Sequence, residues 1–161
     1  METAYLAGGC FWCVEAIFQR VKGVKEIESG YCNGFNQNPS YESVCSGQTG
    51  HAEVVKIDFD ESDVSFHNLL EVFMATHDPT SLNQQGADRG TQYRSAIFYV
   101  NDSQKQIATS MIENIKGAVT EITELDVFYP AESYHQNYFN DNSSQPYCQM
   151  VILPKINKFF N

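Results

Sequence analysis

The apolar residues of this chain change their spacing several times, and that spacing is what most restricts the fold. Helical spacing of three and four recurs in three segments, the first of which contains Val14, Ile17, Phe18 and Val21. The alternation typical of a half-buried strand is clearest over 53–59. Strand-like and helix-like segments are interspersed but do not strictly alternate. This order predicts an α+β fold with a mixed or antiparallel sheet covered by helices.

The predicted elements follow one another along a chain of 161 residues. Strands are expected over 3–7, 24–31, 53–59, 94–100, 121–129 and 148–153, and helices around 14–21, 66–73 and 107–115. A short helical turn is expected over 132–139. The polar stretches 32–50 and 79–93 are interpreted as long loops, which in compact domains are usually functional or disordered. Since no repeat or linker divides the sequence, we predict a single domain, 1–161.

Charge and hydropathy restrict the partners of the chain. Acidic residues outnumber basic ones by 20 to 10, for a net charge of -10, which argues against binding to nucleic acid. No secretory signal is visible, and no apolar run approaches the roughly 18 residues of a membrane span. We therefore expect a cytoplasmic protein without a membrane partner, and a monomer by default.

The five cysteines are expected to be thiols: Cys10, Cys13, Cys32, Cys45 and Cys148. A reducing cytoplasm disfavours a disulfide framework, so reactive or buried cysteines are the expectation. A zinc site with four thiolates would need a second C-x-x-C pair. The sequence holds only one such pair, and we predict no metal.

Cys10 is the strongest candidate nucleophile. It follows a predicted strand and Gly8-Gly9 and opens an amphipathic helix. Free N–H groups and a partial positive charge at a helix start favour a thiolate. The two glycines are expected to let another molecule approach the sulfur, and Phe11 and Trp12 would form an apolar wall beside it. The simpler alternative is that Cys10 is a small buried hydrophobic residue.

Two further functions compete with a sulfur nucleophile of this kind. Cys10 and Cys13 have the C-x-x-C spacing of a general thiol–disulfide oxidoreductase. That enzyme would exchange disulfides on protein substrates and would require Cys13. A non-catalytic acidic interaction domain is the third possibility, and it predicts an unreactive Cys10.

Several motifs resemble those of the type A peptide methionine sulfoxide reductases. The resemblance begins at GGCFWCVEA (8–16) and continues in order through YESVCSGQTGHAEVV (41–55), HDPTSLNQQGADRGTQYRSAIFY (77–99), AESYHQNY (131–138) and PYCQMVILPK (146–155). It implies a ferredoxin-like two-layer sandwich. It also implies reduction of methionine-(S)-sulfoxide, free or in proteins, with electrons from thioredoxin and no cofactor.

The resemblance implies a role for each matching residue. Cys10 would attack the sulfoxide sulfur, and Phe11 and Trp12 would hold the S-methyl group. Glu53 would protonate the sulfoxide oxygen. The polar groups that would orient this oxygen are Tyr41, Asp88 and Tyr93. Cys10 would leave the reaction as a sulfenic acid, which a second cysteine converts to a disulfide.

Physical chemistry supports the role of Glu53 under one condition. A carboxylic acid donates a proton at neutral pH only if burial raises its pKa. Glu53 begins an apolar strand, so we expect burial. Without the resemblance, an exposed charge at a strand edge would be the simpler interpretation of Glu53, a turn residue that of Asp88, and packing aromatics that of both tyrosines.

The resolving cysteine has two candidates. Cys148 matches the position that often resolves the sulfenic acid in the family, although an apolar strand after it could hold it away from Cys10. Cys13 lies one helical turn from Cys10, within the roughly 7 Å between Cα atoms that a disulfide allows. We favour Cys148 and keep Cys13 as the alternative. Cys45 is expected to be structural.

Overall fold

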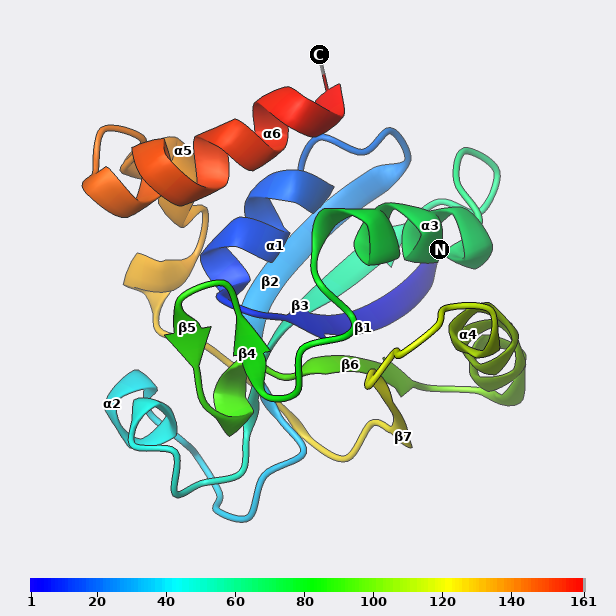
Figure 1. Ribbon diagram of the computed structural model, residues 1–161, viewed down its shortest axis with the longest axis horizontal. Coiled ribbons are helices and arrows are strands. Elements are labelled where there is room, and N and C mark those ends of the chain that lie inside the picture. Colours follow the sequence, from blue (N-terminus) through cyan, green and yellow to red (C-terminus); the bar gives the residue numbers. More distant parts are fainter. Residues whose placement is uncertain (161) are drawn as a thin grey trace.

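A six-stranded sheet forms the centre of the computed structural model, which describes residues 1–160 (Figure 1). Its strand order is β7-β6-β1-β3-β2-β8. All neighbours pair antiparallel except β6 and β7, which are parallel. The bounds are β1 Glu2–Gly8, β2 Val24–Cys32, β3 Ala52–Phe59, β6 Ser95–Tyr99, β7 Glu121–Glu124 and β8 Phe128–Pro130. The predicted mixed sheet is therefore confirmed, while the ferredoxin-like description stays a prediction.

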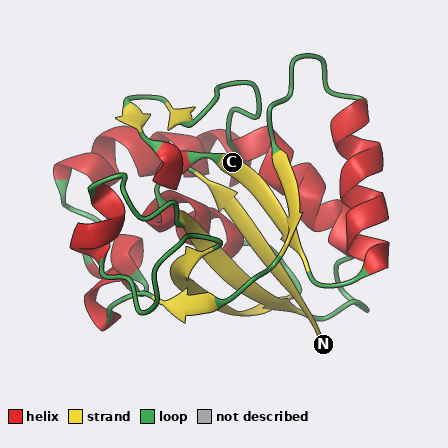
Figure 2. Cartoon of the chain, turned by 90° about the horizontal axis from the view of Figure 1, so that it is seen from below, coloured by secondary structure: helices red, strands yellow, loops and turns green. Residues whose placement is uncertain are grey.

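Helices cover one face of this sheet. They are α1 Phe11–Phe18, α2 Tyr41–Cys45, α3 Phe66–Thr76, α4 Asp102–Glu113, α5 Tyr138–Asp141 and α6 Leu153–Phe160. The main core lies under α1, α3 and α6, and includes Phe18, Phe59 and Phe73. On the other face a smaller cluster around Val54 and Phe98 is covered in part by Leu125. Figure 2 shows the sheet from below, with long loops running across its nearer side. None of the helices within residues 1–160 is long and apolar enough to cross a membrane.

The predicted strand over 148–153 is wrong. Residues Cys148–Ile152 form a π-helical turn that continues into α6. The buried positions of this segment are Cys148, Ile152 and Ile156, and their spacing of four is that of a helix face. The short apolar run within the segment does not by itself distinguish a strand from a buried helix, and the packing decides.

Two other predictions need correction at the level of elements. The expected strand over 121–129 is two strands on opposite edges of the sheet, β7 beside β6 and β8 beside β2. The two expected loops also contain regular structure. The first holds α2, which Ser40 and Ser43 start with a capping box. The second holds the hairpin of β4 (Gln84–Gln85) and β5 (Asp88–Arg89) and the 3₁₀ turn η1 (Thr91–Tyr93).

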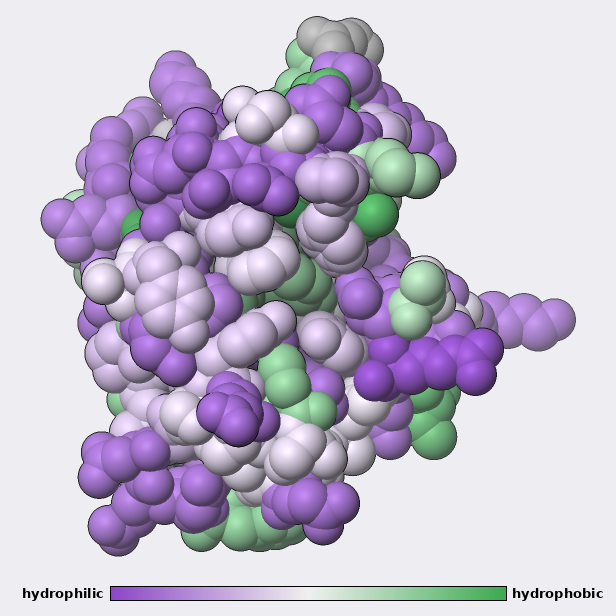
Figure 3. Space-filling model, turned by 90° about the vertical axis from the view of Figure 1, so that its left-hand side faces the viewer, coloured by the Kyte–Doolittle hydropathy of each residue, from purple (hydrophilic) through white to green (hydrophobic). Residues whose placement is uncertain are grey.

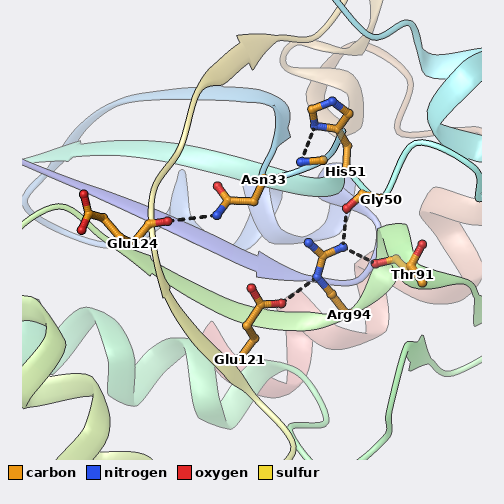
Figure 4. Close-up of polar contacts among 8 residues, drawn as sticks. Asn33, Gly50, His51, Thr91, Arg94, Glu121 and Glu124 are labelled. Carbon is orange, nitrogen blue, oxygen red and sulfur yellow. Dashed lines mark hydrogen bonds and ion pairs between the residues drawn. The ribbon is translucent and has the colours of Figure 1, made fainter. Parts of the chain in front are cut away.

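Arg94 connects three parts of the chain that lie far apart in sequence (Figure 4). Its guanidinium donates to the carbonyls of Gly50 and Thr91, at 3.0 and 2.9 Å, and pairs with Glu121 at 2.9 Å. Next to Gly50, His51 accepts from the Gly34 N–H at 3.1 Å. These bonds fix the start of β3 against η1.

We expect Arg94→Met to lower the free energy of unfolding by about 2 kcal/mol, because two carbonyl oxygens and a carboxylate lose a charged donor. Urea titration followed by circular dichroism measures the change. Lys116→Met, which removes an exposed charge after α4, is the matched control and should change stability by less than about 0.5 kcal/mol. Equal stability of the two variants would contradict the structural role of Arg94.

Candidate active site

Antiparallel pairing brings Cys10 and Glu53 together. Leu6 of β1 pairs with Val55 of β3, so the chain that leaves β1 passes the start of β3. Cys10 is then the N-cap residue of α1. The backbone N–H of Phe11, the first residue of the helix, donates to Glu53 Oε1 at 3.0 Å. The carboxyl group thus bonds directly to the residue that follows the sulfur.

The expected low pKa of Cys10 is wrong for this structure. Burial raises the pKa of the Cys10 thiol well above its ordinary value, and the charge of Glu53 raises it further. The backbone N–H of Trp12 opposes both effects by donating to the sulfur. Desolvation outweighs the favourable helix start because one N–H cannot replace the water that the sulfur loses.

The two glycines before Cys10 also leave room for neighbouring elements. A Cβ on Gly9, whose φ is +96°, would lie 2.8 Å from the Gln85 side chain. A Cβ on Gly8 would lie 2.9 Å from the Phe73 ring. The missing side chains therefore admit the β4–β5 hairpin and α3. Gly8 also lines a pocket beside Cys10, and access of another molecule to the sulfur stays a prediction.

Glu53 is buried, as expected, and one of its two carboxyl oxygens has no hydrogen-bond partner in the part of the chain that the structure describes. The residue is 1% exposed, and Oε2 is buried without a hydrogen-bond partner among residues 1–160. Burial raises the pKa of Glu53 to about 8, against the opposing hydrogen bond from Phe11. At neutral pH the carboxyl group is therefore mainly protonated, and it can act as a proton donor.

Aromatic rings form a wall beside Cys10. Trp12 stacks on Tyr138 with ring centroids 3.8 Å apart and 8° between the planes. Its indole N–H donates to His135 Nδ1 at 3.0 Å. Phe11 is fully buried and lies 5.2 Å from the His135 ring, and Tyr41 lies 4.3 Å from that ring. This aromatic wall contains both residues predicted to hold a methyl group, Phe11 and Trp12.

Tyr41, Tyr93 and Asp88 come from the two predicted loops and meet near Glu53. The charge of Glu53 acts on both tyrosines, and that of Asp88 acts on Glu53, Tyr93 and Cys10. Burial raises the pKa of Tyr41 and Tyr93, so both hydroxyl groups remain donors at neutral pH. The structure thus brings together Cys10 and the four predicted polar residues.

Three residues of the site were not singled out from the sequence. The Tyr147 hydroxyl donates to Asp88 Oδ2 at 2.7 Å. Glu132 accepts from the Tyr41 backbone N–H and from the Tyr31 hydroxyl, each at 2.9 Å. Tyr138 supports Trp12. All three residues lie within motifs of the resemblance, but only the contacts indicate that they hold Asp88, Tyr41 and Trp12 in position.

The other cysteines differ in their surroundings. Cys13 is nearly buried and borders the same pocket as Cys10. Cys148 is fully buried in the main core. Cys32 is fully buried in the smaller cluster, and Cys45, predicted to be structural, is exposed on α2. Within the described residues, no group of three or more His, Cys, Asp or Glu side chains could hold a metal ion.

The surface around the site is of intermediate hydropathy. Figure 3 shows the side of the molecule that carries α2, α5 and β5 in Figure 1. Pale atoms surround a central hollow there, between hydrophilic regions above and below. Such a surface can accept a group that is partly apolar and partly polar.

Comparisons with known proteins agree on one family. The family model described as "Peptide methionine sulfoxide reductase" matches residues 2–161. "Peptide methionine sulfoxide reductase MsrA" of Ruthia magnifica subsp. Calyptogena magnifica is 63% identical over 162 residues, covering 100% of this chain and 99% of the relative.

Solved structures are similar as well. Mxr1 from Saccharomyces cerevisiae in reduced form has a TM-score of 0.84 at 32% identity, covering 91% of this chain and 88% of Mxr1. A second structure of that yeast protein, in complex with Trx2, has a TM-score of 0.57 at 21% identity and covers 85% of this chain and 84% of that one. The second likeness concerns the fold alone.

We expect the stability difference between Glu53→Gln and the parent chain to depend on pH. The pKa of Glu53 is about 8 in the folded chain and near its ordinary value of 4.5 when unfolded. Between these values the folded state binds more protons, so the unfolding free energy of the parent falls as pH rises. Glutamine does not titrate, and it keeps an acceptor for the Phe11 N–H.

Urea unfolding at pH 5 and pH 8 measures this effect. The unfolding free energy of Glu53→Gln relative to the parent should rise by about 3 kcal/mol between the two pH values. Glu113→Gln, which changes an exposed residue of α4, should show no such rise. A Glu53→Gln difference that is flat with pH would show that Glu53 is already ionised at pH 5.

Proposed function

We propose that Cys10 is the nucleophile of this chain, which belongs to the peptide methionine sulfoxide reductase family. The chain is an oxidoreductase that reduces methionine sulfoxide to methionine. The proposal adds the (S) epimer as the substrate, free or within proteins. It also assigns the whole reaction to one catalytic domain, 1–161.

Substrate binding in this proposal divides between apolar and polar groups. The S-methyl group packs against Phe11 and Trp12 of the aromatic wall. The sulfoxide oxygen accepts hydrogen bonds from Tyr41 and Tyr93, whose hydroxyl groups stay protonated because burial raises their pKa. Asp88, held by Tyr147, helps to orient the oxygen through water.

Glu53 supplies the proton that the chemical step requires. Attack of the Cys10 sulfur on the sulfoxide sulfur places negative charge on the oxygen, and Glu53 donates its proton there. Because Cys10 is itself held as a thiol, its proton moves to the carboxylate that Glu53 has become. Oxygen transfers to Cys10, which becomes a sulfenic acid, and methionine leaves. The sulfoxide sulfur gains the two electrons that Cys10 loses.

One observation carries this proposal. Glu53 is a buried acid with a pKa of about 8, and its Oε1 accepts from the residue next to Cys10. The other carboxyl oxygen, Oε2, has no hydrogen-bond partner among residues 1–160. Its purpose is best understood as donation to a bound oxygen atom.

A second cysteine then resolves the sulfenic acid to a disulfide, and thioredoxin reduces the disulfide. Cys148 is the residue that the family resemblance favours for this step, and Cys13 is the alternative. Thioredoxin is proposed because the family resemblance implies it; the similar yeast protein Mxr1 has been solved in complex with Trx2. We also propose that the protein is a monomer and needs no cofactor. We propose a cytoplasmic location because a cycle that begins from free thiols requires a reducing compartment.

We expect Cys10→Ser to abolish release of methionine from a racemic sulfoxide mixture, because the serine hydroxyl is a far weaker nucleophile at neutral pH. Chromatography of the free methionine in a single turnover without reductant measures the result. Cys32→Ala, which removes a thiol from the smaller cluster on the other face of the sheet, should keep parental turnover. Methionine release by Cys10→Ser would remove Cys10 from the reaction. A general disulfide oxidoreductase would instead release no methionine from either chain.

We expect Glu53→Gln to slow the sulfoxide step by about 10²- to 10⁴-fold, the usual contribution of a general acid. In the parent chain, the rate of this step should fall as pH rises through about 8, where Glu53 loses its proton. The variant should show no such fall. Stopped-flow measurement of the single turnover between pH 6 and pH 9 follows both effects, and alkylation of Cys10 should continue in the variant. Unchanged rates in Glu53→Gln would exclude the acid role.

A further inference from the structure

A pocket of about 190 Å³ lies beside Cys10 and is shared by two cysteines and one lysine. Cys10 and Cys13 border it from the start of α1, and Lys155 borders it from α6. Lys155 is the only Lys or Arg among the residues that line the pocket. The pocket therefore joins the proposed nucleophile, a second thiol and a cation.

The geometry of the two cysteines suits a disulfide. The Cys13 N–H donates to the Cys10 carbonyl at 3.1 Å, which fixes the two residues one turn apart. Side chains three positions apart on a helix are neighbours, with about 5–6 Å between Cβ atoms. Disulfides form between cysteines whose Cα atoms lie within about 7 Å. Only a small adjustment at the helix start is needed.

Lys155 acts directly on the Cys13 sulfur. Burial raises the pKa of Cys13, and the Lys155 ammonium opposes this through its charge and through side-chain hydrogen bonding. Cys148 has no such support, because burial raises its pKa without an opposing charge. Cys148, which the family resemblance favours, is fully buried in the main core and does not line the pocket. Cys13, the alternative, is therefore the better placed of the two to resolve Cys10.

The other ionisable groups around the pocket do not replace Lys155. Asp88 of β5 carries a negative charge that raises the pKa of both Cys10 and Cys13. Tyr147 donates to Asp88 and remains protonated, because burial raises its pKa. His77 lies near Lys155, but burial lowers its pKa to about 4, so it is neutral at physiological pH. The ammonium of Lys155 is thus the one group lining the pocket that favours a thiolate by its charge.

We propose that Lys155 is a supporting residue for the resolving step, in which its ammonium stabilises the thiolate of Cys13 for attack on Cys10. This inference rests on the proposed function, which supplies the sulfenic acid. The Cys13 thiolate attacks the Cys10 sulfur, a sulfur–sulfur bond forms, and hydroxide leaves. Hydroxide takes the proton lost earlier from Cys13 and becomes water. Cys10 sulfenic acid is reduced and Cys13 is oxidised, with no further reactant.

Single-turnover experiments with Lys155→Met test the proposal. Reduced protein is mixed with methionine sulfoxide without reductant, remaining thiols are alkylated at successive times, and peptide mass spectrometry identifies the disulfide. The parent chain should form Cys10–Cys13. Lys155→Met should form it about three- to fourfold more slowly at pH 7, because a pKa about one unit higher cuts the thiolate fraction about tenfold while the more basic thiolate recovers part of the rate. Its rate of methionine release should be unchanged.

Two matched variants separate charge from structure. Lys158→Met removes the same charge from the exposed side of α6, and it should resolve at the parental rate. Lys155→Arg keeps the charge and should restore most of the rate. The pH profile of disulfide formation should move to higher pH in Lys155→Met alone, which a general loosening of α6 would not produce.

A second measurement is independent of turnover. In Cys10→Ser, iodoacetamide alkylation of Cys13 should be about three- to fourfold slower at pH 7 when Lys155→Met is added, and unaffected by Lys158→Met. Equal alkylation, a Cys10–Cys148 disulfide, or parental resolving rates in Lys155→Met would each overturn the inference while leaving the sulfoxide step intact. Absence of methionine in the first turnover would overturn the proposed function, and the inference with it.

Discussion

The hydrogen bond from the Phe11 N–H to the Glu53 carboxyl group is the interaction on which the site depends. It exists because β1 and β3 are antiparallel neighbours, so that the start of α1 meets the start of β3. It also occupies one oxygen of a carboxyl group that has almost no contact with water. The bond holds the acid beside the thiol, and burial keeps that acid protonated.

The same burial acts in opposite directions on the two reacting groups. It makes Glu53 a proton donor at neutral pH, and it makes Cys10 a poor thiolate. Neither group can ionise easily while the other is charged. The sulfur is therefore not permanently ionised. The thiol gains reactivity when a bound sulfoxide oxygen takes the proton from Glu53, because the resulting carboxylate can accept the proton of Cys10. A thiol of this kind reacts more slowly with other electrophiles than a thiolate does.

Much of the fold and the identity of the reacting residues could be predicted from the sequence. The periods of the apolar residues predicted the helices α1, α3 and α4 and the strands β1, β2, β3 and β6. They failed at Cys148–Ile152, where a short apolar run fits a strand or a buried helix equally well and packing every fourth residue against the core decides. The buried state of Glu53 followed from its apolar neighbours. The interactions of Tyr147 and Glu132 could not be predicted, because each joins residues 59 or more positions apart.

The sequence by itself determined which chemical groups are available: a cysteine at a helix start, an acid on an apolar strand, and aromatic residues beside them. These are local properties that spacing and residue type reveal. Only the tertiary structure decided which groups meet and in which protonation state. The pKa of Cys10 depends on the water that folding removes and on the carboxyl group that β3 brings near. The surroundings of Cys13 depend on where α6 packs, since Lys155 of that helix borders the same pocket. Desolvation and charge act through space, so no reading along the chain contains them.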